Sequence, residues 1–566
     1  MIPSKRVAAL LVAAAVLFAA CQSSAEKDGP RATGDGSPRD RSAQRIFETK
    51  DPLKRACALP KRYLLRLWRG YHPVHSEDVT FVPQEPNFAG TFNVTSHSGP
   101  WDYLQRVPLV LYGPGFVPEA GNIERPVTLA DIYDTVGRLM QPAGVSLEPR
   151  RGSALTEALE SDRQTAPRLV VQVVWDGVGA NSLNRWDDRW PVLRRLMSAG
   201  TSYERAVVGS SPSITPAAHG TMATGAFPNE HGVTSIDYRT SEGDVRLSFD
   251  QMDPTDLELT TWADQIDAAF DQRSKVGLLA YNTWHVAMGS HGLGVPGGDA
   301  DLLGIVNWRK KGVVETNTGY FRLPGYLDGF ETRLRKHVRK TDLSDGRLDG
   351  EWMGHGIYEK HEAPAWSDYL LDVLLTTMER EEFGKDEVPD FFFVNFKQTD
   401  MAGHAWTIDS EEYAQTLQTQ DRALGDIIDF LDSEVGDYVV ILTSDHGHTR
   451  SAEETGAWPI PQGIMRRDIQ DHFGIPNEEE LFSEGGAYGA YMDHDVAARY
   501  NVTAHKIARF LNGYTIADSW ENGELPTGYE DRGGEHVFSA AFPTDMLPRI
   551  IKCAFDTKEP PDDAGP

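Results

Sequence analysis

Basic side chains are few in this chain compared with acidic ones. Its 566 residues include 55 Lys and Arg against 84 Asp and Glu, a formal net charge of -29. Surfaces that bind nucleic acids hold the phosphate backbone with Lys and Arg, so we expect no nucleic-acid-binding surface. A small phosphorylated ligand is still compatible with this composition, because metal ions can supply the positive charge that the side chains lack.

Long apolar segments are also absent. The longest run, Val7 to Ala20, is shorter than the roughly 20 residues of a membrane-spanning helix, and it lies between the basic start of the chain and Cys21. We interpret residues 1–21 as a lipoprotein-type export signal in which Cys21 is lipidated; simple removal of a signal peptide is the alternative. Residues 22–50, rich in Ser, Gly, Pro and mixed charge, are predicted to be a flexible tether. We therefore expect a protein of the bacterial cell envelope, outside the cytoplasm and anchored to the membrane.

The rest of the sequence has no internal repeat. Apolar, β-rich runs alternate with helix-like stretches, which predicts an α/β fold with a mostly parallel sheet and helices on both of its faces. Four runs stand out, namely 107–112, 169–175, 391–396 and 438–442. Between about 290 and 389 the pattern loosens into a stretch rich in Trp, Gly and charge. We interpret this stretch as a cap insertion.

Three of these runs end at groups of Asp and His. Asp176-Gly177 follows the run at 169–175, Asp400 and His404 follow 391–396, and Asp445-His446 follows 438–442. An Asp-Gly after one strand is usually only a turn, and a single histidine is usually structural. Because ligands bind at the carboxyl ends of strands in open α/β sheets, the three groups together predict a metal site of the mixed oxygen and nitrogen type that zinc accepts.

Thr215-Pro216 opens a segment of small residues that ends at Gly225. A threonine followed by proline is typical of a helix N-cap with proline in the first helical position. On this interpretation Thr215 has only a structural role. The functional alternative places its hydroxyl at the positive end of the helix, where an anion would bind and where a metal ion would ionise the hydroxyl.

Taken in chain order, these motifs resemble those of the alkaline phosphatase superfamily, above all its type I phosphodiesterase and nucleotide pyrophosphatase branch. The resemblance implies an α/β hydrolase of phosphoric esters that uses two divalent metal ions, Zn2+, and a threonine nucleophile, Thr215. One ion would be held by Asp176, Thr215, Asp445 and His446. The other would be held by Asp400, His404 and one histidine from near the family's C-terminus.

That last histidine is not found where the family has it. After His448 the candidate is His536, whose neighbours resemble a buried strand. A better match lies near the N-terminus, where His97 and the residues up to Gly115 are similar to the family's closing segment. We therefore interpret residues 51–165 as the C-terminal part of the catalytic domain moved to the front by circular permutation, and 166–566 as its main part. His97 then completes the second metal site.

The permutation carries an expectation about cysteine. Besides Cys21, the chain has only Cys57 and Cys553, which flank the two ends that an unpermuted chain would join. We expect them to form a disulfide in an oxidising compartment.

The substrate is less well defined. The asparagine that the phosphodiesterase branch has after its His-Gly is missing after His231-Gly232, and 281–285 lacks the basic cluster of related phosphomonoesterases. The missing basic cluster favours a phosphodiester, a pyrophosphate or an uncommon substrate over a monoester. A sulfatase of the same fold is the nearest alternative, but it would need Cys or Ser where Thr215 stands and Arg where His219 stands. A manganese-dependent mutase is disfavoured by the export signal, and a non-catalytic anion-binding lipoprotein by the seven ligand-type residues in matching positions.

Overall fold

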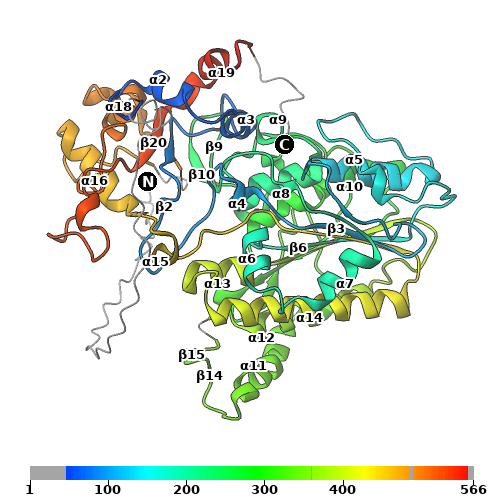
Figure 1. Ribbon diagram of the computed structural model, residues 1–566. Coiled ribbons are helices and arrows are strands. Elements are labelled where there is room, and N and C mark those ends of the chain that lie inside the picture. Colours follow the sequence, from blue (N-terminus) through cyan, green and yellow to red (C-terminus); the bar gives the residue numbers. More distant parts are fainter. Residues whose placement is uncertain (1–45, 359, 484–487, 559–566) are drawn as a thin grey trace, which may run out of the picture. The chain divides into compact units, whose positions relative to one another are not determined.

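The computed structural model describes residues 46–358, 360–483 and 488–558 (Figure 1). The export signal, Cys21 and most of the proposed tether lie outside the described residues. Within those residues, no helix combines the length and apolar character needed to cross a membrane.

A nine-stranded sheet forms the centre of the described chain. In spatial order its strands are β13 (Val313–Glu315), β12 (Leu302–Asn307), β11 (Val276–Ala280), β16 (Asp390–Phe396), β6 (Leu169–Trp175), β17 (Tyr438–Thr443), β3 (Leu109–Tyr112), β7 (Thr201–Tyr203) and β4 (Gly121–Ile123). The five strands from β12 to β17 are mutually parallel, whereas β13 and β3 run antiparallel to their neighbours. The sheet is therefore mostly parallel, as the alternating pattern predicts.

Helices cover both faces of this sheet. The side chains of its central strand, β6, point alternately into two hydrophobic cores, one on each face. Leu169, Val171 and Val173 of β6 join a core with α7 (Pro191–Ala199), α12 (Pro364–Arg380) and α14 (Glu411–Glu434). Val170 and Val174 join a second core with α5 (Asp131–Met140), α8 (Thr215–Thr224) and α10 (Trp262–Ala269). Successive side chains of a strand point to opposite faces, so an all-apolar strand needs cover on both. Figure 1 shows α12 and α14 on one side of the sheet and α5 and α10 on the other. The predicted fold class is confirmed.

The interval predicted as a cap insertion, about 290–389, needs correction. Its strands β12 and β13 extend the central sheet. Tyr369 and Leu370 of α12 are fully buried in the same core as Leu169 of β6. The segments that lie outside the sheet are shorter; they include α11 (Leu334–Asp342) and the hairpin of β14 (Glu351–Trp352) and β15 (His355–Gly356). The mistake arose because β12 is a short apolar run interrupted by Gly304.

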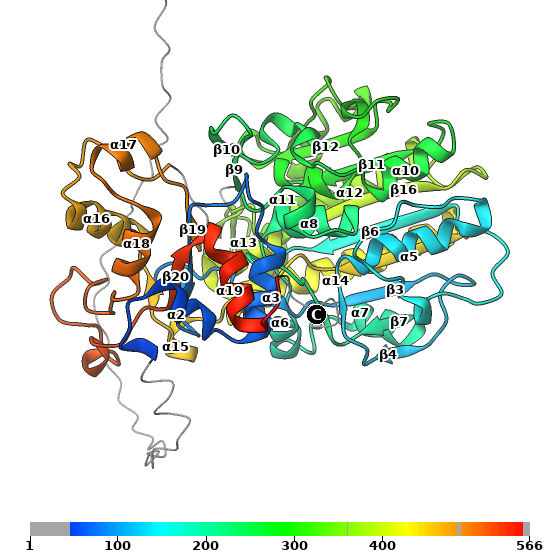
Figure 2. The same cartoon turned by 90° about the horizontal axis from the view of Figure 1, so that it is seen from above.

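A second, antiparallel sheet was not anticipated. It pairs β1 (Val79–Pro83) with β20 (Phe538–Pro543) on one side and β19 (Gly489–Ala490) on the other. It shares a separate apolar core with α16 (Gln462–Phe473), α17 (His494–Arg499) and α18 (Ala504–Leu511), which Figure 2 shows grouped around β19 and β20. Segments from the two ends of the described chain thus form one hydrophobic core.

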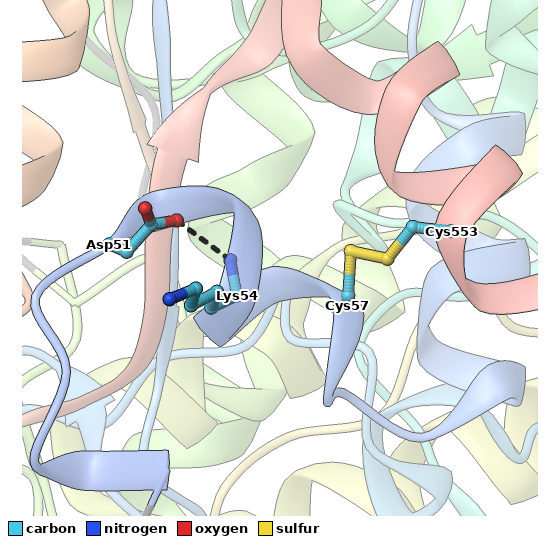
Figure 3. The surroundings of a disulfide bond; sticks show 4 residues. All are labelled: Asp51, Lys54, Cys57 and Cys553. Atoms are coloured by element: carbon cyan, nitrogen blue, oxygen red, sulfur yellow. Dashed lines mark hydrogen bonds between the residues drawn. A yellow bond between two sulfur atoms is a disulfide. The ribbon is translucent and has the colours of Figure 1, made fainter.

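The same two ends are also joined covalently. α2 (Pro52–Cys57) and α19 (Leu547–Phe555) are linked by a Cys57–Cys553 disulfide, with their Cα atoms 6.1 Å apart (Figure 3). Arg55 of α2 is buried and donates hydrogen bonds to the backbone carbonyls of Phe538 (2.5 Å) and Ser539 (2.8 Å). A buried guanidinium needs such acceptors, so α2 is anchored to the C-terminal strand by polar as well as covalent contacts.

We predict that replacing both cysteines, Cys57→Ser with Cys553→Ser, lowers stability without abolishing the active site. The crosslink closes a loop across a sequence separation of 496 residues, and losing such a constraint costs about 2–4 kcal/mol. Guanidinium denaturation of the double variant, with reduced wild-type protein as the control, measures the change. An unchanged denaturation midpoint in both samples would contradict the prediction.

Candidate active site

Three neighbouring parallel strands deliver acidic side chains to one edge of the sheet. Asp176 directly follows β6, and Asp445 lies two residues after β17. Asp400 lies on α13 (Gln398–Trp406), which follows β16. Gly177 has φ 72°, and a Cβ there would lie 2.8 Å from the Cα of Asp400, so the turn after β6 needs glycine. All three carboxylates are at most 2% exposed.

One cluster forms around the Nε2 atom of His446. This atom lies 3.4 Å from Asp445 Oδ2, 3.7 Å from Asp176 Oδ1 and 3.4 Å from Thr215 Oγ1. Four ligands at about 2.0–2.1 Å from a tetrahedral Zn2+ are separated by similar distances. These four side chains are the set that the sequence predicted for the first ion.

A second cluster forms around Asp400 Oδ1. The Nε2 atoms of His404, His97 and His448 lie 3.5, 3.6 and 3.6 Å from it. Asp400, His404 and His448 form one compact group of possible ligands, and His97 groups with Asp400 and His446. His97 thus lies between the two clusters, where its ring stacks on that of His446 with centroids 3.6 Å apart.

Backbone carbonyls set the orientation of the histidine rings. The Nδ1 of His404 lies 2.7 Å from Thr95 O, that of His446 3.0 Å from Gly447 O, and that of His97 3.2 Å from Ser213 O. A carbonyl can only accept, so each Nδ1 carries the proton and each Nε2 presents a lone pair to the site. Metal-binding histidines are held in this way. Burial lowers the pKa of His97, with His446 adding to the effect, so the ring stays neutral.

The carboxylates are held from behind. Asp176 Oδ2 accepts hydrogen bonds from His285 Nε2 and Asn395 Nδ2, both at 3.1 Å, and Asp445 Oδ1 accepts one from the Gly177 N–H at 3.1 Å. The opposite oxygens, Asp176 Oδ1 and Asp445 Oδ2, therefore face the cluster around His446 Nε2.

The atoms that face the clusters include some that have no hydrogen-bond partner. Asp400 Oδ1, Asp445 Oδ2 and His448 Nε2 are buried and unpaired. A buried polar atom without a partner costs about 1–3 kcal/mol, and more when it is charged. These unpaired atoms are acceptors, and no residue that the structure describes donates a hydrogen bond to them. Such converging carboxylate and imidazole lone pairs can bind a divalent cation.

Lys397, between β16 and α13, is the one cation that the described residues place between these carboxylates. Its Nζ lies 2.8 Å from Asp176 Oδ1, 2.9 Å from Asp400 Oδ2 and 3.2 Å from Thr215 Oγ1. Burial alone would lower the pKa of Lys397, but Asp176 and Asp400 raise it above its usual value, so the ammonium is charged. Asp445 has no such partner: burial and the charge of Asp176 raise its pKa to about 7.

Thr215 is the first residue of α8, and its side chain does not cap the helix. The residue before the helix is Ile214, so the predicted N-cap assignment is wrong. The hydroxyl instead faces His446 and Lys397, while the carbonyl of Thr215 accepts a hydrogen bond from His219 Nδ1 at 2.6 Å. The helix N-terminus still places partial positive charge at this position.

A cavity of about 450 Å³ opens onto Thr215. Trp284 and Trp308 form part of its wall, and the Trp308 ring stacks on His361 with centroids 4.0 Å apart. Asn282 and the exposed Arg309 also line it. The cavity thus offers an apolar wall beside the hydroxyl and the two clusters.

The structure brings together all seven residues predicted for the metal sites, which are His97, Asp176, Thr215, Asp400, His404, Asp445 and His446. His536, two residues before β20, pairs its backbone with Thr515 and stacks on Phe47, as its strand-like neighbours indicated. Lys397 and His448 were not predicted as site residues from the sequence. Both lie within three residues of a predicted ligand in the sequence. The positive charge of Lys397 and the imidazole donor of His448 were the signals that could have identified them.

The profile of a family described as type I phosphodiesterase / nucleotide pyrophosphatase matches residues 170–533. Alkaline phosphatase PafA of Elizabethkingia meningoseptica is 24% identical over 408 residues, which cover 61% of this chain and 72% of that protein. Alkaline phosphatase PhoK of a Sphingomonas species is 22% identical over 377 residues, 59% of this chain and 66% of that protein. The crystal structure of alkaline phosphatase PafA superposes with a TM-score of 0.47 at 18% identity, covering 66% of this chain and 84% of that chain.

We predict that Asp445→Asn stabilises the metal-free protein at alkaline pH. Folding raises the pKa of Asp445 to about 7, so between about pH 4 and 7 the unfolded chain releases a proton that the folded chain retains. This carboxyl therefore lowers the free energy of unfolding as pH rises through that window, and an amide would not.

Urea denaturation in EDTA at pH 5 and pH 8.5 tests the sign. The advantage of the variant over wild type should appear only at pH 8.5. Asp187→Asn, at an exposed position, is the matched control for the exchange itself. Equal stability of Asp445→Asn and wild type at pH 8.5 would contradict the prediction.

Proposed function

Because the chain belongs to the type I phosphodiesterase / nucleotide pyrophosphatase family and is a phosphoric ester hydrolase, we propose that it cleaves its substrate through Thr215 with two divalent metal ions. The observation that carries this proposal is the position of Thr215 Oγ1. It lies at the N-terminus of α8, 3.4 Å from His446 Nε2, on the wall of the cavity.

The first ion would be held by Asp176, Thr215, Asp445 and His446. The second would be held by Asp400, His404 and His448, which lie in one group, while His97, the third ligand predicted from the sequence, would lie adjacent to both ions. The mixed carboxylate and imidazole donors favour Zn2+. When bound, the ions would lower the pKa of the Thr215 hydroxyl, so that its proton passes to water, and would offset the charge of the phosphoryl group.

The chain's own residues then carry the reaction. Thr215 Oγ1 forms a bond to phosphorus while the bond from phosphorus to the ester oxygen breaks, and the alcohol leaves after taking a proton from water. Water then attacks the phosphothreonine, restores the hydroxyl and releases phosphate or a phosphomonoester. His219 holds the backbone of Thr215, and His285 and Asn395 hold Asp176, so the nucleophile is positioned before the substrate arrives.

The apolar wall of the cavity fits a substrate that carries a bulky apolar group. Trp284 and Asn282 line it in the segment where related phosphomonoesterases carry basic residues. We therefore propose a phosphodiester or a pyrophosphate as the preferred substrate. The Trp284 and Trp308 rings would contact its apolar part.

We also propose that the chain order is a circular permutation. β1 and β20, from opposite ends of the described chain, pair as antiparallel neighbours, and the disulfide joins the adjacent helices. The family profile begins at residue 170, whereas His97 reaches the site from the segment before it. Compact domains tolerate new ends where the old ones lie close together.

We also propose that the protein is located outside the cytoplasm. The Cys57–Cys553 pair supports it, because structural disulfides persist in oxidising compartments. Lipidation of Cys21 would tether the enzyme to the membrane.

We predict that Thr215→Ala abolishes turnover and leaves metal binding largely intact. Removing a nucleophile costs many orders of magnitude, so kcat should fall by about 10³-fold or more. The test combines kcat on aryl phosphodiesters and monoesters with zinc content, and with acid trapping of a phosphorylated wild-type intermediate. Undiminished turnover of Thr215→Ala would refute the nucleophile assignment.

We predict that His448→Ala selectively weakens the binding of one of the two metal ions. Its unpaired Nε2 faces Asp400, so its loss should reduce affinity by more than the about 10–100-fold that follows loss of an outer-shell partner. Zinc titration of the metal-free protein would then give one site like that of wild type and one weaker site. His355→Ala, at a histidine of the β14–β15 hairpin, is the control. Two unchanged sites in His448→Ala would exclude His448 as a ligand.

A further inference from the structure

Lys397 is a charged side chain buried at the centre of the site. It is 4% exposed, and its ammonium group contacts one carboxylate from each cluster, Asp176 and Asp400. An ammonium has three N–H donors, and the third direction leads to Thr215 Oγ1 at 3.2 Å. All three donors thus have partners in the site, and none is directed to bulk solvent.

The ammonium does not take the place of either metal ion. A cation standing in for the second ion would contact Asp400 Oδ1, but Lys397 contacts Oδ2, and Oδ1 has no hydrogen-bond partner. At the first cluster Lys397 contacts Asp176 Oδ1 and Thr215 Oγ1, but a cation standing in for the first ion would also contact Asp445 Oδ2, which is unpaired. Of the three carboxylate oxygens that face the clusters, Lys397 thus contacts Asp176 Oδ1 and leaves Asp400 Oδ1 and Asp445 Oδ2 free.

The same ammonium reaches the place where the phosphoryl group would be transferred. Lys397 and Thr215 both line the cavity, and they face each other within hydrogen-bond distance. A phosphoryl group bonded to Thr215 Oγ1 would have its oxygens next to this fixed positive charge. A preorganised charge of this kind stabilises a transition state strongly, because it is placed before the reaction begins.

We infer that Lys397 is a catalytic residue, which holds the Thr215 hydroxyl for attack and stabilises the charge on the phosphoryl group during its transfer. It donates hydrogen bonds and remains protonated, so it neither gives nor takes a proton in either step. The bonds that form and break are those of Thr215, the phosphorus and the ester oxygen. This inference rests on the proposed function, in which Thr215 is the nucleophile.

The test compares Lys397→Met, which keeps the length of the side chain without its charge, with the exposed Lys336→Met on α11 as the matched control. Metal content, affinity for inorganic phosphate and kcat/KM are measured on the zinc-loaded, full-length proteins. We expect Lys397→Met to bind two zinc ions, to bind phosphate about 10- to 100-fold more weakly, and to lose about 10²- to 10³-fold in kcat/KM. Lys336→Met should match wild type in all three.

A second variant keeps the inference testable if Lys397→Met folds poorly. In Lys397→Ala, added ethylamine should restore part of kcat in a saturable manner, which a merely structural role would not allow. Undiminished kcat/KM in Lys397→Met would overturn the inference, and so would a loss fully explained by missing zinc or a lack of amine rescue. These results differ from failure of the proposed function, in which Thr215→Ala itself would stay active.

Discussion

The repulsion among three buried carboxylates is the constraint on which the site depends. Asp176, Asp400 and Asp445 come from the ends of three neighbouring strands and are almost completely removed from water. Ionised carboxylates at such distances in a protein interior require positive charge. Lys397 supplies one charge, and the raised pKa of Asp445 is a sign that one charge is not enough. Two divalent ions would supply the remaining positive charge, and the histidine rings are oriented to bind them.

His97 reaches the site from a different part of the chain than the three acids. The strands that carry the acids are consecutive in the sheet, but His97 arrives from a segment before the first of them. That segment reaches the site because β1 pairs with β20 and α2 is bound to α19, which fixes the N-terminal part against the C-terminal part. The disulfide and the buried Arg55 hold α2 to the C-terminal segment. The His97 ring itself is held by Ser213 O and Ser98 Oγ.

Much of this arrangement could be predicted from residues at strand ends. β6, β16 and β17 are strongly apolar, and the acids after them could be placed at one edge because the carboxyl ends of parallel strands meet there. Thr215 was identified through resemblance, while its structural role was misread: the hydroxyl has its partners across the site rather than on its own helix. His448 and Lys397 could not be assigned, because a histidine or lysine beside a ligand motif is more often a surface or structural residue. Only the three-dimensional contacts with Asp400 distinguish them.

The edges of the fold were harder to predict than its centre. The apolar run of β12 is interrupted by Gly304, so its place in the sheet depends on pairing with β11 rather than on local pattern. The second sheet joins strands more than 400 residues apart, and no local signal announces such a pairing.

Anomalous diffraction at the zinc edge from crystals of the zinc-loaded protein would locate the bound metal ions. We expect two peaks. One should lie within bonding distance of Asp176, Thr215, Asp445 and His446, and the other within bonding distance of Asp400, His404 and His448. A single peak, or strong peaks elsewhere with none beside Thr215, would contradict the proposed pair of metal sites.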